Sequence, residues 1–108
     1  MPGRKFRVIF ARTAERDLCE IRDYWISRGE SRRGSKYFHD PLTKAETALA
    51  DPATARAGRN PRDVDVPDVR ELVVFKHSYR ILYRLDETNR VAEVLRFWHT
   101  HRDTPPLT

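Results

Sequence analysis

The sequence predicts an α+β fold, with an N-terminal strand, a two-helix antiparallel hairpin and a three-stranded antiparallel meander that together form one sheet. Three observations lead to this prediction. A short β-rich run opens the chain, two stretches with helical spacing of apolar residues follow, and three strand-like runs come near the end. The length of 108 residues fits a single domain over residues 1–108 with one modest core.

The run KFRVIF at residues 5–10 predicts the first strand, which leads directly into a helix. Thr13 stands where the N-cap of that helix is expected, with Glu15 and Asp17 in the following turn to suit the helix dipole. Gly29 is expected to end the helix. Spacings of four, three and four predict one buried apolar stripe made of Ala14, Leu18, Ile21 and Trp25.

A second amphipathic helix is predicted between residues 31 and 52. Its apolar face holds Phe38, Leu42, Ala45 and Leu49, and the Asp51-Pro52 pair is expected to stop it. Pro41 leaves two alternatives, because a proline either bends a helix that runs through it or follows an N-cap, here Asp40, as the first helical residue. Two such helices with a short link predict the antiparallel hairpin.

Residues 51–69 contain three of the seven prolines and show no periodicity, so we expect one long irregular loop there. The strand-like runs VRELVVF, SYRILYRL and RVAEVLRFWH come next, and their short separations predict successive hairpins. The helices would then cover one face of an antiparallel sheet and leave the other face open. Alternation within SYRILYRL places Arg80 on that open face.

Composition narrows the class of partner and the cellular compartment. The formal net charge is +5 and the isoelectric point is near 9.8, which favours either a polyanionic or acidic partner or simply a solubilising charged surface. Cys19 is the single cysteine, so no intramolecular disulfide is possible. No apolar run reaches the length of a signal peptide or a membrane span, and we therefore expect a cytoplasmic protein.

Five short motifs occur over nearly the whole chain. They are A..DL.EI..YW from Ala14 to Trp25, L..P from Leu49 to Pro52, VREL at 69–72, YRILY at 79–83 and VLRFWH..RD at 94–103. In this order and spacing they resemble the RelE/ParE superfamily, the toxins of bacterial type II toxin–antitoxin modules. The resemblance implies a four-stranded antiparallel sheet with an N-terminal helical hairpin. It also implies a protein that uses no cofactor.

The resemblance also implies a partner. Toxins of this kind are neutralised by a cognate antitoxin, here expected to be ParD-like, whose disordered tail folds along the toxin surface to form a hetero-oligomer. If that tail crosses the helical hairpin, Tyr24 or Trp25 is expected to be partly exposed and to contact it.

The superfamily that this sequence resembles includes toxins with two different functions, and the fold does not distinguish them. ParE-type toxins inhibit growth by binding DNA gyrase without cutting, whereas RelE-type toxins are ribosome-dependent mRNA endonucleases. The H..RD ending at His99, Arg102 and Asp103 looks closer to ParE, and the chain lacks the aromatic C-terminal segment and the lysine cluster of the RelE branch. The sequence therefore favours a ParE-like binding toxin that is not an enzyme, with the ribonuclease and an inactive antitoxin-binding relative as alternatives.

Under the ribonuclease alternative, cleavage needs a base, an acid and positive charge on the phosphate. Arg80 and Arg102 would then hold the phosphate, and His99 or His101 would move the proton, so the candidate catalytic residues are Arg80, His99 and Arg102. The structural alternative for Arg80 is an ion pair with a carboxylate such as Glu93. Two neighbouring histidines are too few ligands for zinc, so no metal site is expected.

Overall fold

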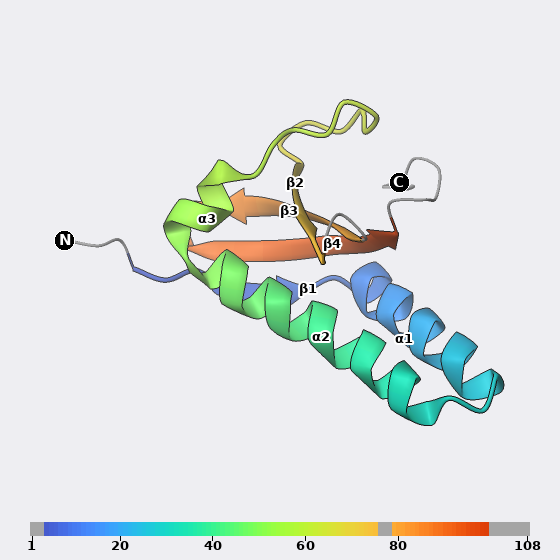
Figure 1. The fold of residues 1–108 in the computed structure, drawn as a ribbon. Helices are drawn as coiled ribbons and strands as arrows, with labels where there is room; N and C mark the ends of the chain where they lie inside the picture. Colours follow the sequence, from blue (N-terminus) through green and yellow to red (C-terminus); the bar gives the residue numbers. More distant parts are fainter. Residues whose placement is uncertain (1–3, 76–78, 100–108) are drawn as a thin grey trace.

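The computed structural model describes residues 4–75 and 79–99 of the chain. Its elements, in chain order, are strand β1 (Arg7–Phe10), helices α1 (Arg12–Ser27), α2 (Ser31–Ala50) and α3 (Pro52–Ala57), and strands β2 (Arg70–Val74), β3 (Tyr79–Asp86) and β4 (Val91–His99). The predicted α+β class is confirmed, with α1 and α2 forming a hairpin that packs on one side of a single sheet (Figure 1).

The sheet has the strand order β1-β4-β3-β2. Strands β2, β3 and β4 form the predicted antiparallel meander, but β1 pairs with β4 in parallel, so the expectation of a wholly antiparallel sheet was wrong. The helical hairpin explains the difference. It returns the chain to the beginning of β1, where the Phe6 amide donates to the Ala50 carbonyl over 2.9 Å, so β2 starts at the same end as β1. Two reversals later, β4 runs in the direction of β1.

The two ends of α1 differ in how well they were predicted. Thr13 is not the N-cap, because Ala11 occupies that position without a side-chain cap and the Thr13 hydroxyl donates instead to the Leu95 carbonyl over 2.8 Å. Gly29 does end the helix, with a φ of 77° that favours glycine. The amides of Gly29 and Glu30 donate back to carbonyls of the last turn, which satisfies groups that would otherwise lack partners.

Helix α2 runs through Pro41 without a break and begins ten residues earlier, at Ser31. The alternative in which the helix starts at Asp40-Pro41 was therefore wrong. Pro41 is buried on the inner side of α2. Gly34, also buried, lets α2 approach α1 closely, because a Cβ atom there would lie 2.8 Å from the Arg22 carbonyl oxygen.

Residues 51–69 are not one irregular loop, because they begin with the short helix α3. The Asp51 carboxylate caps this helix by accepting hydrogen bonds from the Ala53 amide (3.3 Å) and the Thr54 hydroxyl (2.9 Å). Pro52 occupies the first helical position, which suits its fixed φ. The Asp51-Pro52 pair thus ends α2, as predicted, and also starts α3, which the sequence interpretation missed.

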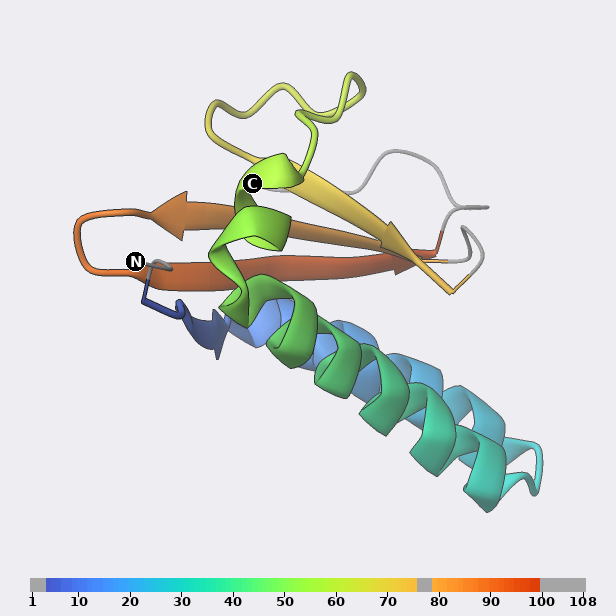
Figure 2. The same cartoon turned by 60° about the vertical axis from the view of Figure 1, so that its left-hand side comes forward.

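The hydrophobic core lies between the helices and one face of the sheet. Its buried members include Ala14, Leu18, Ala45, Leu49, Ile81, Tyr83, Val94 and Phe97. The predicted stripe of α1 is buried only in its first half, since Ile21 and Trp25 are half-buried. The reason is visible in Figure 2, where the far half of the α1–α2 hairpin extends beyond the edge of the sheet.

Candidate functional site

The second half of β4 has no strand beside it on the β1 side, because β1 ends at Phe10. Side chains of α1 bond to this exposed backbone instead. The Thr13 hydroxyl donates to the Leu95 carbonyl, and the Asp17 carboxylate accepts from the Phe97 amide over 3.0 Å. Helix α1 therefore covers a sheet edge that would otherwise be available for pairing.

Three arginines, namely Arg80, Arg84 and Arg96, lie on the sheet face opposite the helices. Arg96 binds Asp17. Arg96 donates to it from Nε over 2.7 Å and from a terminal nitrogen over 2.8 Å, and both side chains are largely buried. The same guanidinium lies 4.8 Å from the centre of the Trp98 ring. The hydrogen bonds to Asp17 raise the pKa of Arg96.

Arg80 lies on this face, as predicted, and two carboxylates bind it. Its Nε donates to Glu71 over 2.7 Å, and its two terminal nitrogens donate to the two oxygens of Asp63 over 2.9 and 2.7 Å. Its side chain is 14% exposed. The hydrogen bonds to Asp63, followed by the one to Glu71, raise the pKa of Arg80 despite the opposing effect of burial. An arginine so neutralised offers little positive charge to a phosphate.

Arg80 pairs with carboxylates, as the structural alternative expects, but Glu93, the residue named as an example, is not one of them. In the β3–β4 register Arg80 lies opposite Trp98, while Glu93 lies opposite Arg84. Glu93 accordingly pairs with Arg84 over 3.0 Å. The structural interpretation of Arg80 as an ion-paired residue still holds, with different carboxylates.

The face that the sequence predicts to be open is covered at its centre. The loop at 58–69 pairs with the edge of the sheet, where the backbones of Arg59 and Glu71 exchange hydrogen bonds of 3.2 and 2.7 Å. Farther along the loop, Pro61 is buried and Asp63 reaches Arg80. The loop is therefore fastened to the sheet at two points.

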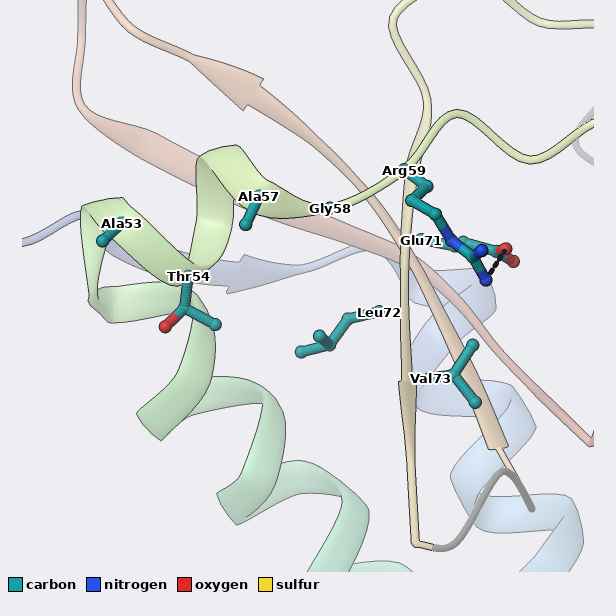
Figure 3. Close-up of a pocket in the computed structure, with 8 residues that line it drawn as sticks. All are labelled: Ala53, Thr54, Ala57, Gly58, Arg59, Glu71, Leu72 and Val73. Carbon is teal, nitrogen blue, oxygen red and sulfur yellow. Dashed lines mark ion pairs between the residues drawn. The ribbon is translucent and has the colours of Figure 1, made fainter.

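A groove of about 530 Å³ separates α3 from the outer edge of β2 (Figure 3). Ala53, Ala57 and Gly58 give one wall only small side chains. Leu72 points from β2 toward α3, whereas Glu71 points to the other side of the strand and pairs with Arg59. The groove is thus concave, mostly apolar and bordered by an edge strand.

The backbone of β2 faces this groove with groups available for pairing. Glu71 directs its amide and carbonyl outward to Arg59, and alternate residues of a strand direct these groups to the same side. Val73 therefore directs its amide and carbonyl outward as well, and no other backbone group within residues 4–75 and 79–99 bonds to them. Pairing along this edge of β2 stops at Arg59, because the residues that precede Arg59 in the chain form α3.

A buried tyrosine holds the α3 wall of the groove in place. The Tyr83 hydroxyl donates to the Ala55 carbonyl over 2.6 Å, and burial raises the pKa of this phenol. Gly58, just after α3, packs so closely on the Tyr83 ring that no Cβ atom would fit there. The position of α3 relative to β2 therefore depends on Tyr83 and Gly58.

Of the three candidate catalytic residues, Arg80 is the one whose side chain falls within the described residues. Arg80 is bound by carboxylates, His99 is the last residue of β4 and its side chain lies outside the described residues, and Arg102 lies outside them altogether, as does His101. Sequence reasoning missed Asp17 and Asp63 as partners of arginines. Asp17 was interpreted only through the helix dipole, and no periodic pattern marks Asp63.

The described residues show neither a metal-binding cluster nor a membrane-spanning helix. Within residues 4–75 and 79–99, no three potential metal ligands lie close enough together to hold an ion. In the same part of the chain, none of the helices has both the length and the apolar character that crossing a membrane requires.

Comparison with known proteins identifies the relatives of this chain. Residues 8–104 match the family model described as ParE toxin of type II toxin–antitoxin system, parDE. The chromosomal ParDE toxin–antitoxin system from P. aeruginosa has a chain with a TM-score of 0.72 and 21% identity, covering 92% of this chain and 100% of that chain. The RelBE2 toxin–antitoxin complex from Mycobacterium tuberculosis follows with a TM-score of 0.58 and 20% identity, covering 88% and 98%. No curated protein matches significantly.

Proposed function

This chain belongs to the ParE toxin family of type II toxin–antitoxin systems, and on that basis we propose that it inhibits growth by binding DNA gyrase in the cytoplasm. The observation that supports binding over catalysis is the state of Arg80. A ribonuclease needs an arginine available to the scissile phosphate, whereas Arg80 already donates three hydrogen bonds to Glu71 and Asp63. A toxin that acts by binding needs no such arginine.

The proposal predicts that removing Arg80 leaves toxicity intact. We expect the double variant Arg80→Ala/Glu71→Gln to inhibit growth within about twofold of the wild type, a change in binding free energy of roughly 0.4 kcal/mol or less. Glu71→Gln is included because Glu71 is nearly buried and an unpaired charge there would destabilise the fold. The measurement is incorporation of labelled thymidine and labelled methionine in the first minutes after induction without antitoxin.

DNA synthesis should fall first in both the wild type and the double variant. If methionine incorporation falls first and the double variant is inactive although folded, the chain is a ribosome-dependent ribonuclease instead. If induced wild-type cells grow and incorporate both labels normally, the chain is an inactive antitoxin-binding relative. The urea midpoint of the purified variant serves as the control for folding.

We further propose that a cognate antitoxin, ParD-like and with a disordered tail, binds in the groove between α3 and β2. An extended peptide there would pair with the outward amide and carbonyl of Val73 and place apolar side chains against Ala57 and Leu72. Arg59, whose side chain is 80% exposed at the rim of the groove, favours an acidic tail. The groove thus offers backbone pairing, apolar contact and charge complementarity to one extended segment.

Ala57→Glu tests this site, because it puts both bulk and negative charge in the groove. We expect the affinity for the antitoxin that protects cells from this chain to fall at least about tenfold, while toxicity without antitoxin is unchanged. Ala57→Ser, which keeps the side chain small, is the matched control and should bind normally. Titration of the purified toxins with antitoxin provides the measurement, and equal affinities for the two variants would place the antitoxin elsewhere.

A further inference from the structure

The far end of the α1–α2 hairpin carries a cluster of aromatic side chains that the core does not use. We call this cluster the hairpin tip; it consists of Tyr24, Trp25, Ile26, Arg28, Arg33 and Tyr37. Its rings contact one another, with centroids 5.1 Å apart for Tyr24 and Trp25 and 5.5 Å apart for Trp25 and Tyr37. Because this end extends beyond the sheet, the rings belong to no part of the main core (Figures 1 and 2).

The apolar groups of the hairpin tip are unusually exposed. Tyr24 is 49% exposed and Ile26 is 46% exposed, the highest values for large apolar side chains in the described chain. Arginines cover the ring faces, since the guanidinium of Arg28 lies 4.6 Å from the Tyr24 ring centre and that of Arg33 lies 4.7 Å from the Trp25 ring centre. Tryptophan, tyrosine and arginine are the residues that most often dominate the energy of protein interfaces.

The surroundings of the tip are positively charged. Residues 22–37 contain two acids, Asp23 and Glu30, and these pair with Arg22 over 3.2 Å and with Arg33 over 3.6 Å. The same segment holds five basic residues, namely Arg22, Arg28, Arg32, Arg33 and Lys36. The excess of positive charge favours a partner with carboxylates around an apolar contact.

Hydrogen bonds and close helix packing stabilise the backbone at the tip. Gly29 makes the turn with a left-handed φ, and its amide and that of Glu30 close the end of α1. Close packing at Gly34 then fixes α2 against α1. A preorganised projection loses little entropy when it binds, which increases its affinity.

We propose that the hairpin tip inserts into a concave, acid-rimmed pocket on the folded protein that this toxin inhibits. The inference rests on the proposed function, in which growth inhibition arises from binding. Shape supports the target over the antitoxin as the occupant, because a convex projection complements a pocket, whereas a disordered tail gains most from an extended groove or strand edge. The groove beside β2 is such a site. Target and antitoxin would therefore contact different regions of the toxin.

The variant Tyr24→Ser/Ile26→Ser/Arg28→Glu changes only exposed side chains of the tip. With purified DNA gyrase as the probe, we expect the toxin concentration for half-inhibition of supercoiling to rise at least about thirtyfold, as loss of an interface hot spot would require. Growth inhibition should be lost as well, while complex formation with antitoxin is unchanged. Val66→Ser/Arg62→Glu alters an exposed apolar and an exposed basic residue of the loop at 58–69, and this matched control should behave as the wild type.

The readouts separate failure of this inference from failure of the gyrase proposal. If the wild type is toxic but does not inhibit gyrase, gyrase is not the target, and growth inhibition alone then tests the role of the tip. Loss of growth inhibition in the tip variant, with growth inhibition retained in the control variant, would still support this inference. A tip variant that remains as toxic as the wild type overturns the inference. So does a folded tip variant that no longer binds antitoxin, because the antitoxin would then be the occupant. Arg28→Glu alone, at an exposed position after α1, repeats the test if the triple variant unfolds.

Discussion

Asp17→Ala is expected to lower the free energy of unfolding by about 3–5 kcal/mol, as found when one member of a buried ion pair is removed. The Asp17 side chain is 8% exposed and accepts hydrogen bonds from Arg96 and from the Phe97 amide. Its removal leaves a guanidinium with 15% exposure and a backbone amide of β4 without their acceptor. Urea denaturation followed by circular dichroism measures the loss.

Asp23→Ala provides the matched control on the same helix. Asp23 is 66% exposed and pairs with its neighbour Arg22, so its loss is expected to cost less than about 1 kcal/mol. The loss in free energy of unfolding for Asp17→Asn should lie between the losses for Asp17→Ala and Asp23→Ala. The amide oxygen of asparagine still accepts from the Phe97 amide but carries no charge to pair with Arg96. Equal effects of Asp17→Ala and Asp23→Ala would show that α1 does not stabilise the edge of β4 through this carboxylate.

Gly58→Ala is expected to lower the free energy of unfolding by about 2–4 kcal/mol, the combined effect of overpacking and of a broken buried hydrogen bond. Gly58 has a φ of −59°, which any residue adopts, so backbone freedom is not the reason for glycine here. The added methyl group would overlap the Tyr83 hydroxyl, which must move away from the Ala55 carbonyl. Thermal and urea denaturation of the purified variant check this prediction.

Two further variants isolate the cause. In Gly29→Ala the added methyl group would have no atom within 4 Å, but alanine would have to adopt a φ of 77°. Backbone strain should therefore lower the free energy of unfolding by only about 1–2 kcal/mol. Gly58→Ala combined with Tyr83→Phe removes the overlapping hydroxyl, and the double variant should lose less than the sum of the single effects. Strict additivity would contradict the proposed contact. If this contact also holds the groove, Gly58→Ala should weaken antitoxin binding as well.

The candidate site was predictable only in part. Period-2 alternation correctly placed Arg80 on the sheet face away from the helices, because side-chain direction in a strand follows directly from sequence position. The partners of Arg80 were not predictable in the same way. Asp63 comes from an irregular loop whose path no periodic pattern indicates, and Glu93 lies too far along the β3–β4 ladder to reach Arg80.

By itself the sequence determined the α+β class, the hairpin of two helices, the end of α1 at Gly29 and the antiparallel meander. Each of these depends on interactions between residues close in the chain, such as the spacing of apolar side chains and the φ that a turn requires. Only the tertiary structure decided that β1 runs parallel to β4, that Asp17 covers the edge of β4, and that Asp63 binds Arg80. These depend on where separate elements meet in space, and a pairing between residues 79 positions apart, as in Asp17 and Arg96, leaves no local pattern in the sequence.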